Sequence, residues 1–207
     1  MALPTLARRV VTLGAPLVLG LIELGHPALM PSDDIVDTLE PIAAWWTALH
    51  IAQVPLFALL GYAVWLTVRD LDGRAARVSR GAIAIFIVVY PAFDAAVGVA
   101  SGLLMQSIGA PSAATRAAID PFLQALFWGP VTGTLALIGS LSWLVALAAA
   151  ALAWRRARAP WMVVALLALS GVLLAIAHIR PFGPLACLAF LLASAWVEFG
   201  RISAARA

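Results

Sequence analysis

The sequence predicts an all-α protein, a polytopic membrane bundle of six transmembrane helices. Of its 207 residues, 64% are hydrophobic and only 11% are charged. The mean hydropathy is +1.02. A soluble domain carries about 25% charged residues, so this composition is typical of a membrane protein. The apolar residues gather into segments near the length of about 20 residues that crosses a bilayer. We expect one integral-membrane domain covering 1–207.

Six segments are apolar and long enough to cross the membrane as helices. They are residues 10–30, 41–68, 81–106, 130–154, 160–178 and 182–199. The first segment follows two arginines but does not end in a small-residue cleavage site, which favours an uncleaved span over a signal peptide. The last two segments are separated only by His178–Pro184, where two prolines and a glycine predict a tight helical hairpin.

The longest connection, residues 107–129, lies between the third and fourth spans. Asp120 followed by Pro121 resembles a helix N-cap with proline at the first helical position. This pattern predicts a short interfacial helix, or an early turn of the fourth span that is broken at Gly129. In either arrangement the segment would cover the outer face of the bundle.

The charges predict the orientation of the spans, and all thirteen basic residues are arginine. With the N-terminus inside, eleven arginines fall on the inner side. These are Arg8, Arg9, Arg69, Arg74, Arg77, Arg80, Arg155, Arg156, Arg158, Arg201 and Arg206. Only Arg116 and Arg180 fall outside, which is the positive-inside distribution. We therefore expect a bacterial cytoplasmic membrane protein with both termini cytoplasmic, and no nucleic-acid partner.

Ionisable residues inside the spans lie at similar heights. Glu23 and Asp94 each follow an inner arginine by fourteen residues, which puts both about 21 Å above it. His26 and Gln53 come out at about 24–26 Å and His50 near 28 Å. Polar groups in lipid are costly and usually functional, so this layer is the main functional clue.

Helical spacing places these groups on continuous stripes. Glu23 and His26 are three residues apart and share a face. The second span carries the stripe Trp46, His50, Gln53 and Phe57. The third carries Tyr90, Asp94, Gly98 and Ser101. Because lipid cannot solvate polar groups, we expect both stripes to face the bundle interior and to form an outward-facing pocket.

Two kinds of chemistry fit this layer. Glu23, Asp94 and His50 are the candidate catalytic residues, since a carboxyl group desolvated in a pocket can hold or accept a proton near neutral pH. Alternatively, zinc or iron would be ligated by Glu23, His26, His50 and Asp94. The expected pocket residues are His26, Trp46, Gln53, Tyr90 and His178. Haem fits less well, because only His26 and His50 have similar depth.

Two classes of function remain open from the sequence. The first is an enzyme that acts by acid–base or metal chemistry on a small apolar or lipid-like molecule. The second is a transporter or accessory membrane subunit whose polar layer serves proton movement or helix packing. The expected partners are membrane lipids and a small apolar ligand, while the substrate, the metal and the oligomeric state stay undetermined.

Overall fold

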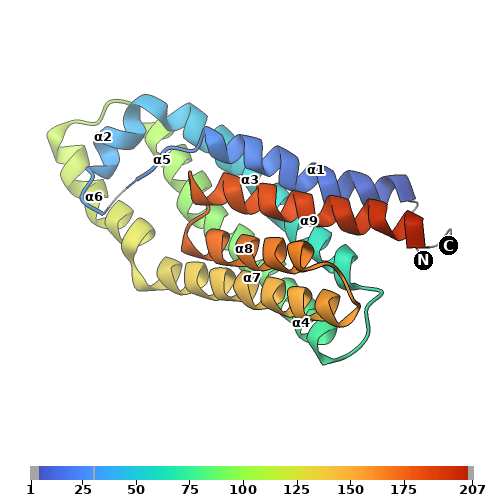
Figure 1. Ribbon diagram of the computed structural model, residues 1–207. Coiled ribbons are helices and arrows are strands. Elements are labelled where there is room, and N and C mark those ends of the chain that lie inside the picture. Colours follow the sequence, from blue (N-terminus) through green and yellow to red (C-terminus); the bar gives the residue numbers. More distant parts are fainter. Residues whose placement is uncertain (1–4, 30, 205–207) are drawn as a thin grey trace.

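Six helices of the chain pack side by side around a common core (Figure 1). The computed structural model describes residues 5–29 and 31–204, with side chains as far as residue 200, and this part of the chain forms helices without strands. The six are α1 (Thr5–Leu24), α3 (Ala43–Val68), α4 (Arg74–Asp94), α7 (Pro130–Arg156), α8 (Trp161–Ile176) and α9 (Phe182–Ala204). Each packs against the next in the order α1, α3, α4, α7, α8, α9, and α9 returns to α1, which closes a ring.

The helices confirm an all-α architecture compatible with a membrane bundle, but five rather than six described segments reach the length expected of a span. Five helical segments of the described chain are long and apolar enough to cross a bilayer. They are Thr5–Leu24, Ile35–Val68, Arg74–Ile108, Ala113–Arg156 and Phe182–Gly200. The span expected at 160–178 is the 16-residue helix α8, and its length of about 24 Å is less than the 30 Å of hydrocarbon. It ends early because Ala177 is extended and turns the chain toward α9.

The boundaries of the first span differ in a way that matters for the site. The helix expected over residues 10–30 begins at Thr5 and ends at Leu24, and Met30 lies outside the described residues. The chain beyond Leu24 is a turn at Gly25, followed by a segment without regular secondary structure at residues 26–29. His26 therefore stands on this segment rather than one turn above Glu23 on a continuous helix.

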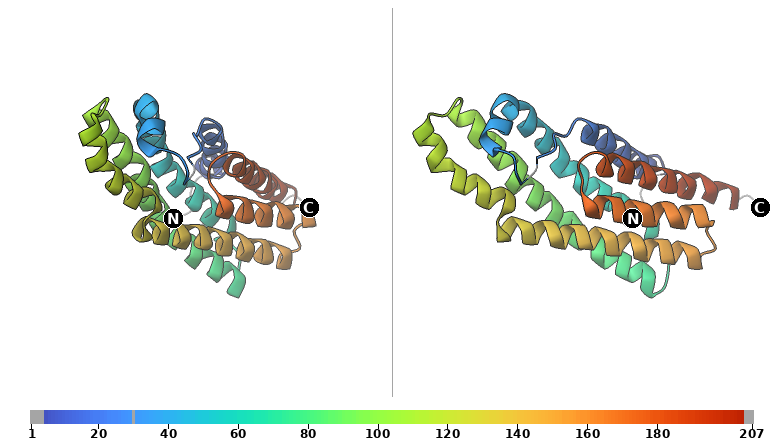
Figure 2. Two further views of the ribbon diagram at one scale, coloured as in Figure 1. Left: turned by 90° about the vertical axis from the view of Figure 1, so that its left-hand side faces the viewer. Right: turned by 60° about the vertical axis from the view of Figure 1, so that its left-hand side comes forward.

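Shorter helices gather at the end of the ring that is opposite the start of α1 (Figure 2). They are α2 (Ile35–Leu39), the 3-10 helix η1 (Glu40–Ile42), the π-helix η2 (Ala95–Val99), α5 (Ala100–Ile108) and α6 (Ala113–Trp128). The expected start of α6 at Asp120 is wrong. Ser112 is the N-cap, since its side chain accepts a hydrogen bond from the Thr115 N–H, and Pro121 lies inside the helix.

Helix α6 is fixed to this end by charge and by apolar packing. The Arg116 guanidinium lies 2.6 Å from an Asp37 carboxylate oxygen and 3.3 Å from one of Glu40. Leu123 is fully buried in a small cluster that also holds Trp46. Exposed ion pairs contribute little stability, so the buried Leu123 is the stronger attachment.

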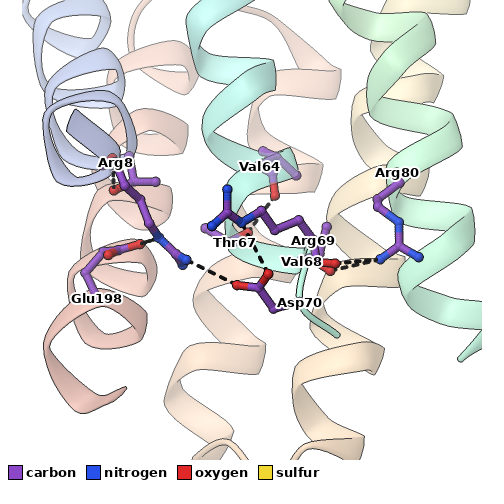
Figure 3. Close-up of polar contacts among 9 residues, drawn as sticks. Arg8, Val64, Thr67, Val68, Arg69, Asp70, Arg80 and Glu198 are labelled. Atoms are coloured by element: carbon purple, nitrogen blue, oxygen red, sulfur yellow. Dashed lines mark hydrogen bonds and ion pairs between the residues drawn. The ribbon is translucent and has the colours of Figure 1, made fainter. Parts of the chain in front are cut away.

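The opposite end of the ring is tied by arginine (Figure 3). Arg8 Nε lies 2.7 Å from Glu198 Oε1, and Arg8 Nη1 lies 3.3 Å from Asp70 Oδ2. Arg80 donates to the carbonyls of Val68 and Leu71, at the end of α3 and just beyond it. These contacts bring together the starts of α1 and α4 and the ends of α3 and α9. The side chain of Arg201 and all of Arg206 lie outside the described residues.

Large apolar side chains fill the centre of the ring between the two ends. Phe57, Phe86, Trp143 and Phe190 are fully buried there. Phe86 stacks on Tyr90 with ring centroids 5.1 Å apart. Closely packed apolar side chains therefore separate the polar residues near α6 from the arginine-rich end of the ring.

Candidate functional site

A cavity of about 170 Å³ lies at the end of the ring that carries α6. The polar residues in its wall are His26, His50, Asp94 and His178. Most of the remaining wall is apolar or aromatic: Pro27, Leu29, Trp46, Phe93, Val97, Phe127, Trp128, Ala177 and Ile179. An apolar cavity with a few convergent polar groups is the usual form of a small-molecule site.

Glu23 lies beside the cavity in the last turn of α1, where it is 1% exposed. Gln53 of α3 is also fully buried, and its Nε2 donates to Glu23 Oε1 over 2.6 Å. This bond holds the carboxyl group in one orientation. It leaves Glu23 Oε2 and Gln53 Oε1 buried without a hydrogen-bond partner.

The contacts of His26 and His50 define which ring nitrogen is free. His26 Nδ1 lies 2.6 Å from the Pro27 carbonyl oxygen, and His50 Nδ1 lies 2.7 Å from the Trp46 carbonyl oxygen. A carbonyl only accepts hydrogen bonds, so each Nδ1 must carry a proton. In the neutral ring, Nε2 then keeps its lone pair for a ligand or a proton.

His178 approaches the same place from the turn between α8 and α9. Its Nδ1 lies 3.0 Å from the Tyr90 hydroxyl, and its ring centroid lies 5.0 Å from that of His26. One ligand atom each from Glu23, His26 and His178 lie within 4.8 Å of one another. His178 was expected as a pocket residue, but its place beside Glu23 and His26 depends on the turn, which leaves no periodic signal in the sequence.

Asp94 stands where α4 changes into the π-helix η2. It is 2% exposed, and its Oδ2 has no hydrogen-bond partner. The wider turn is stabilised from outside, because Trp46 Nε1 donates to the Gly98 carbonyl over 2.9 Å. Single π turns inside helices occur frequently at functional sites. The sequence did not predict this turn, because neither apolar length nor helical spacing distinguishes a π turn from an ordinary α-helix.

Gly98 gives His50 its position. A Cβ atom at residue 98 would lie 1.8 Å from Cδ2 of the His50 ring. Only glycine therefore lets the ring lie directly against the backbone of η2. The close approach sets His50 of α3 beside Asp94 in the cavity wall.

The structure thus brings all eight expected site residues to one region. His26, Trp46, His50, Asp94 and His178 line the cavity, while Gln53 and Tyr90 support Glu23 and His178 through hydrogen bonds. Five polar atoms of this region are buried without a hydrogen-bond partner. They are Glu23 Oε2, His26 Nε2, Gln53 Oε1, Asp94 Oδ2 and His178 Nε2.

No protein-family model, curated protein or solved structure matches this chain. The reactive side-chain groups in this region are two carboxyl groups, three imidazoles and a tyrosine hydroxyl, which lie around an apolar cavity. Such a set can transfer protons, and its carboxylate and imidazole groups can ligate a metal ion.

Proposed function

We propose that the protein is a membrane-embedded enzyme that admits a small apolar or lipid-like molecule to this cavity and acts on it by acid–base or metal chemistry. Glu23, Asp94 and His50 are the proposed catalytic groups. The proposal includes six crossings of a bacterial cytoplasmic membrane with both termini inside, so that the cavity opens in the outer half of the bilayer.

One observation carries the proposal: five buried polar atoms that have no hydrogen-bond partner lie at or beside the cavity. Buried polar groups in proteins are nearly always hydrogen-bonded, and exceptions call for an explanation. Polar residues that served only helix packing would satisfy one another. Here Asp94 Oδ2 has no partner in the cavity wall, and Glu23 Oε2 has none beside the lining residues His26 and His178, which suits a ligand that supplies the missing contacts.

The packed core favours an enzyme over a transporter. Phe57 and Tyr90 pack edge to face beneath the polar layer, and Phe86 and Trp143 lie deeper in the same apolar cluster. A solute or proton moving from the cavity to the arginine-rich end would have to displace these side chains. A reaction inside the cavity requires no such path.

Amide variants test this proposal. Glu23→Gln and Asp94→Asn keep side-chain size while removing a charge that is costly in lipid, so both should fold. We expect expression of the wild-type chain in a bacterial host to change at least one apolar or lipid species in a mass-spectrometric extract. At least one amide variant should reduce that change tenfold or more.

Asp72→Asn is the matched control, because it makes the same change at an exposed carboxylate in the loop before α4. It should behave as the wild type does. Thermal unfolding in detergent, measured on each variant, verifies that the fold is kept. The proposal is wrong if both folded amide variants act like the wild type, or if the wild-type chain changes no species relative to an empty vector.

A further inference from the structure

We infer that Glu23, His26 and His178 bind one divalent transition-metal ion, zinc or iron(II), and leave a coordination position open toward the cavity. The inference deepens the proposed function and rests on it for the role of the open position. It differs from the ligand set expected from the sequence, because His178 takes part and His50 and Asp94 stand beside the ion instead of binding it.

The donor atoms have the right kind and spacing. A zinc ion holds nitrogen and oxygen ligands at about 2.0–2.2 Å, which places tetrahedral ligand atoms about 3.4 Å apart. The three ligand atoms here lie within 4.8 Å of one another. Closure onto an ion therefore needs side-chain movements of about 1 Å, within the range of ordinary rotamer adjustment.

Every proposed ligand also has a supporting partner on its other side. Glu23 Oε1 accepts from Gln53. His26 Nδ1 is held by the Pro27 carbonyl. His178 Nδ1 is held by the Tyr90 hydroxyl, and a proton on this nitrogen leaves Nε2 free. Metal-binding histidines almost always donate their second ring nitrogen in this way, and ligating carboxylates are likewise hydrogen-bonded.

The atoms left free are the ones a metal would use. Glu23 Oε2, His26 Nε2 and His178 Nε2 are buried and have no hydrogen-bond partner in the structure. Within residues 5–29 and 31–200, neither Glu23 nor Asp94 belongs to an ion pair with a basic side chain. A divalent cation would balance the two carboxylates, which are otherwise costly to bury as anions.

Three protein ligands of this kind are typical of reactive sites. Two histidines and one carboxylate hold catalytic zinc, and the same set with open positions holds iron(II) in oxygenases. His26 and His178 both line the cavity, so the open position faces the space where an apolar molecule would lie. His50 and Asp94 line the same space and are placed to exchange protons with a molecule held there.

Metal titration of the full chain in detergent tests the inference. The protein is stripped with a chelator, dialysed, and loaded separately with Zn²⁺, Fe²⁺ without oxygen, or Co²⁺ as a coloured probe. We expect about one ion per chain by elemental analysis for at least one of zinc and iron. Bound Co²⁺ should show the intense visible bands of a low-coordinate site, and the bound ion should raise the unfolding temperature.

Variants then identify the ligands. Glu23→Gln and His178→Ala should each lower the affinity at least tenfold. Tyr90→Phe, which keeps all three ligands, should lower it by about 10-fold to 100-fold. His50→Ala is the matched control and should still bind about one ion. Far-ultraviolet circular dichroism and gel filtration report whether each variant keeps the fold, and the wild-type titration does not depend on any variant.

The inference is overturned if the wild-type chain binds neither zinc nor iron. It is also overturned if folded His178→Ala binds as the wild type does, or if His50→Ala loses the ion while His178→Ala keeps it. These results are independent of the lipid measurements. An ion bound at this site without any lipid change would support the metal site and contradict the enzyme, while a lipid change without a bound ion would do the reverse.

Discussion

At the scale of single residues, the site depends on glycines that leave room for the rings of neighbouring side chains. Gly98 admits the ring of His50, and Gly139 admits Tyr90, whose Cδ2 would lie 2.6 Å from a Cβ at residue 139. Tyr90 in turn holds His178. Two glycines on different helices therefore determine where two of the three imidazole rings are held.

Replacing Gly98 tests this dependence. Gly98→Ala should destabilise the protein by about 1–3 kcal/mol, because the new methyl group must push the His50 ring or separate α3 from η2. Gly81→Ala is the control, since a Cβ at this exposed position of the same helical segment meets no atom within 4 Å. It should be neutral or stabilising by up to about 1 kcal/mol. Thermal unfolding in detergent measures both, and equal stability of the two variants would contradict the packing described here.

Burial of the polar residues on the spans could be predicted from the sequence, since helical spacing alone placed them on common stripes. His50, Gln53 and Asp94 are all at most 3% exposed. The position of His178 could not be derived in this way. It lies on a turn, and the direction of a turn follows from packing between helices rather than from periodicity.

At the scale of elements, the path from α4 through η2 to α5 determines the shape of the cavity. A π turn leaves backbone carbonyls without regular helical partners. Ser101 Oγ donates to the Val97 carbonyl, and the Trp46 indole reaches both the Gly98 carbonyl and Ser101. The wide turn is therefore supported by α3, and Asp94 enters the cavity at the point where it begins.

The indole bond should carry much of this support. Trp46→Phe keeps an aromatic ring but leaves the buried Gly98 carbonyl with one partner fewer, which should cost about 1–3 kcal/mol. Trp45→Phe is the neighbouring control, since Trp45 is 52% exposed and its N–H reaches Gly25 over 3.4 Å. It should change stability by less than about 0.5 kcal/mol. Hydrogen exchange at residues 95–101 should accelerate only in Trp46→Phe, and unchanged exchange in that variant would argue against the role of the indole.

The sequence predicted the presence of the long helices better than their ends and connections, for a physical reason. Apolar length indicates a helix but not where it begins: α3 begins within two residues of its expected start at 41, whereas α1 begins five residues before 10 and α4 begins seven residues before 81. Helix α6 begins at Ala113 rather than Asp120, because Pro121 is tolerated inside a helix whose start is capped by Ser112. Two local sequences, one at Ser112 and one at Asp120, each resemble a helix start. The tertiary contacts of Arg116 and Leu123 that hold the longer helix cannot be recognised from such local patterns.

At the scale of the whole molecule, the two ends of the ring differ in chemistry. Arg8 and Arg80 tie helix ends together at one end, whereas the other end carries the cavity and the acidic residues that pair with Arg116. This separation of charge agrees with the arginine distribution that predicts the orientation. The orientation stays a prediction, and so does the crossing of the bilayer by the short helix α8.

Cysteine labelling settles whether α8 crosses. In a Cys187→Ser background, which removes the buried native thiol, Arg180→Cys lies between α8 and α9 and Ala157→Cys lies between α7 and α8. Both positions are exposed. We expect a membrane-impermeant maleimide to label only Arg180→Cys in intact cells. Helix α8 is about 6 Å shorter than the hydrocarbon core, and local thinning of the bilayer accommodates such a mismatch at a fraction of a kcal/mol per Å.

Two further positions fix the orientation of the bundle independently of α8. Ser107→Cys lies at the end of α5 and Asp72→Cys lies in the loop between α3 and α4, and both are exposed. Ser107→Cys should be labelled in intact cells, while Asp72→Cys should require permeabilised ones. Labelling of Arg180→Cys and Ala157→Cys from the same side would mean that α8 does not cross. Residues 182–204 would then enter the membrane from the inner side, which conflicts with the contact between Arg8 at the start of α1 and Glu198 near the end of α9. Because that contact places both helix ends together, we expect an even number of crossings between them.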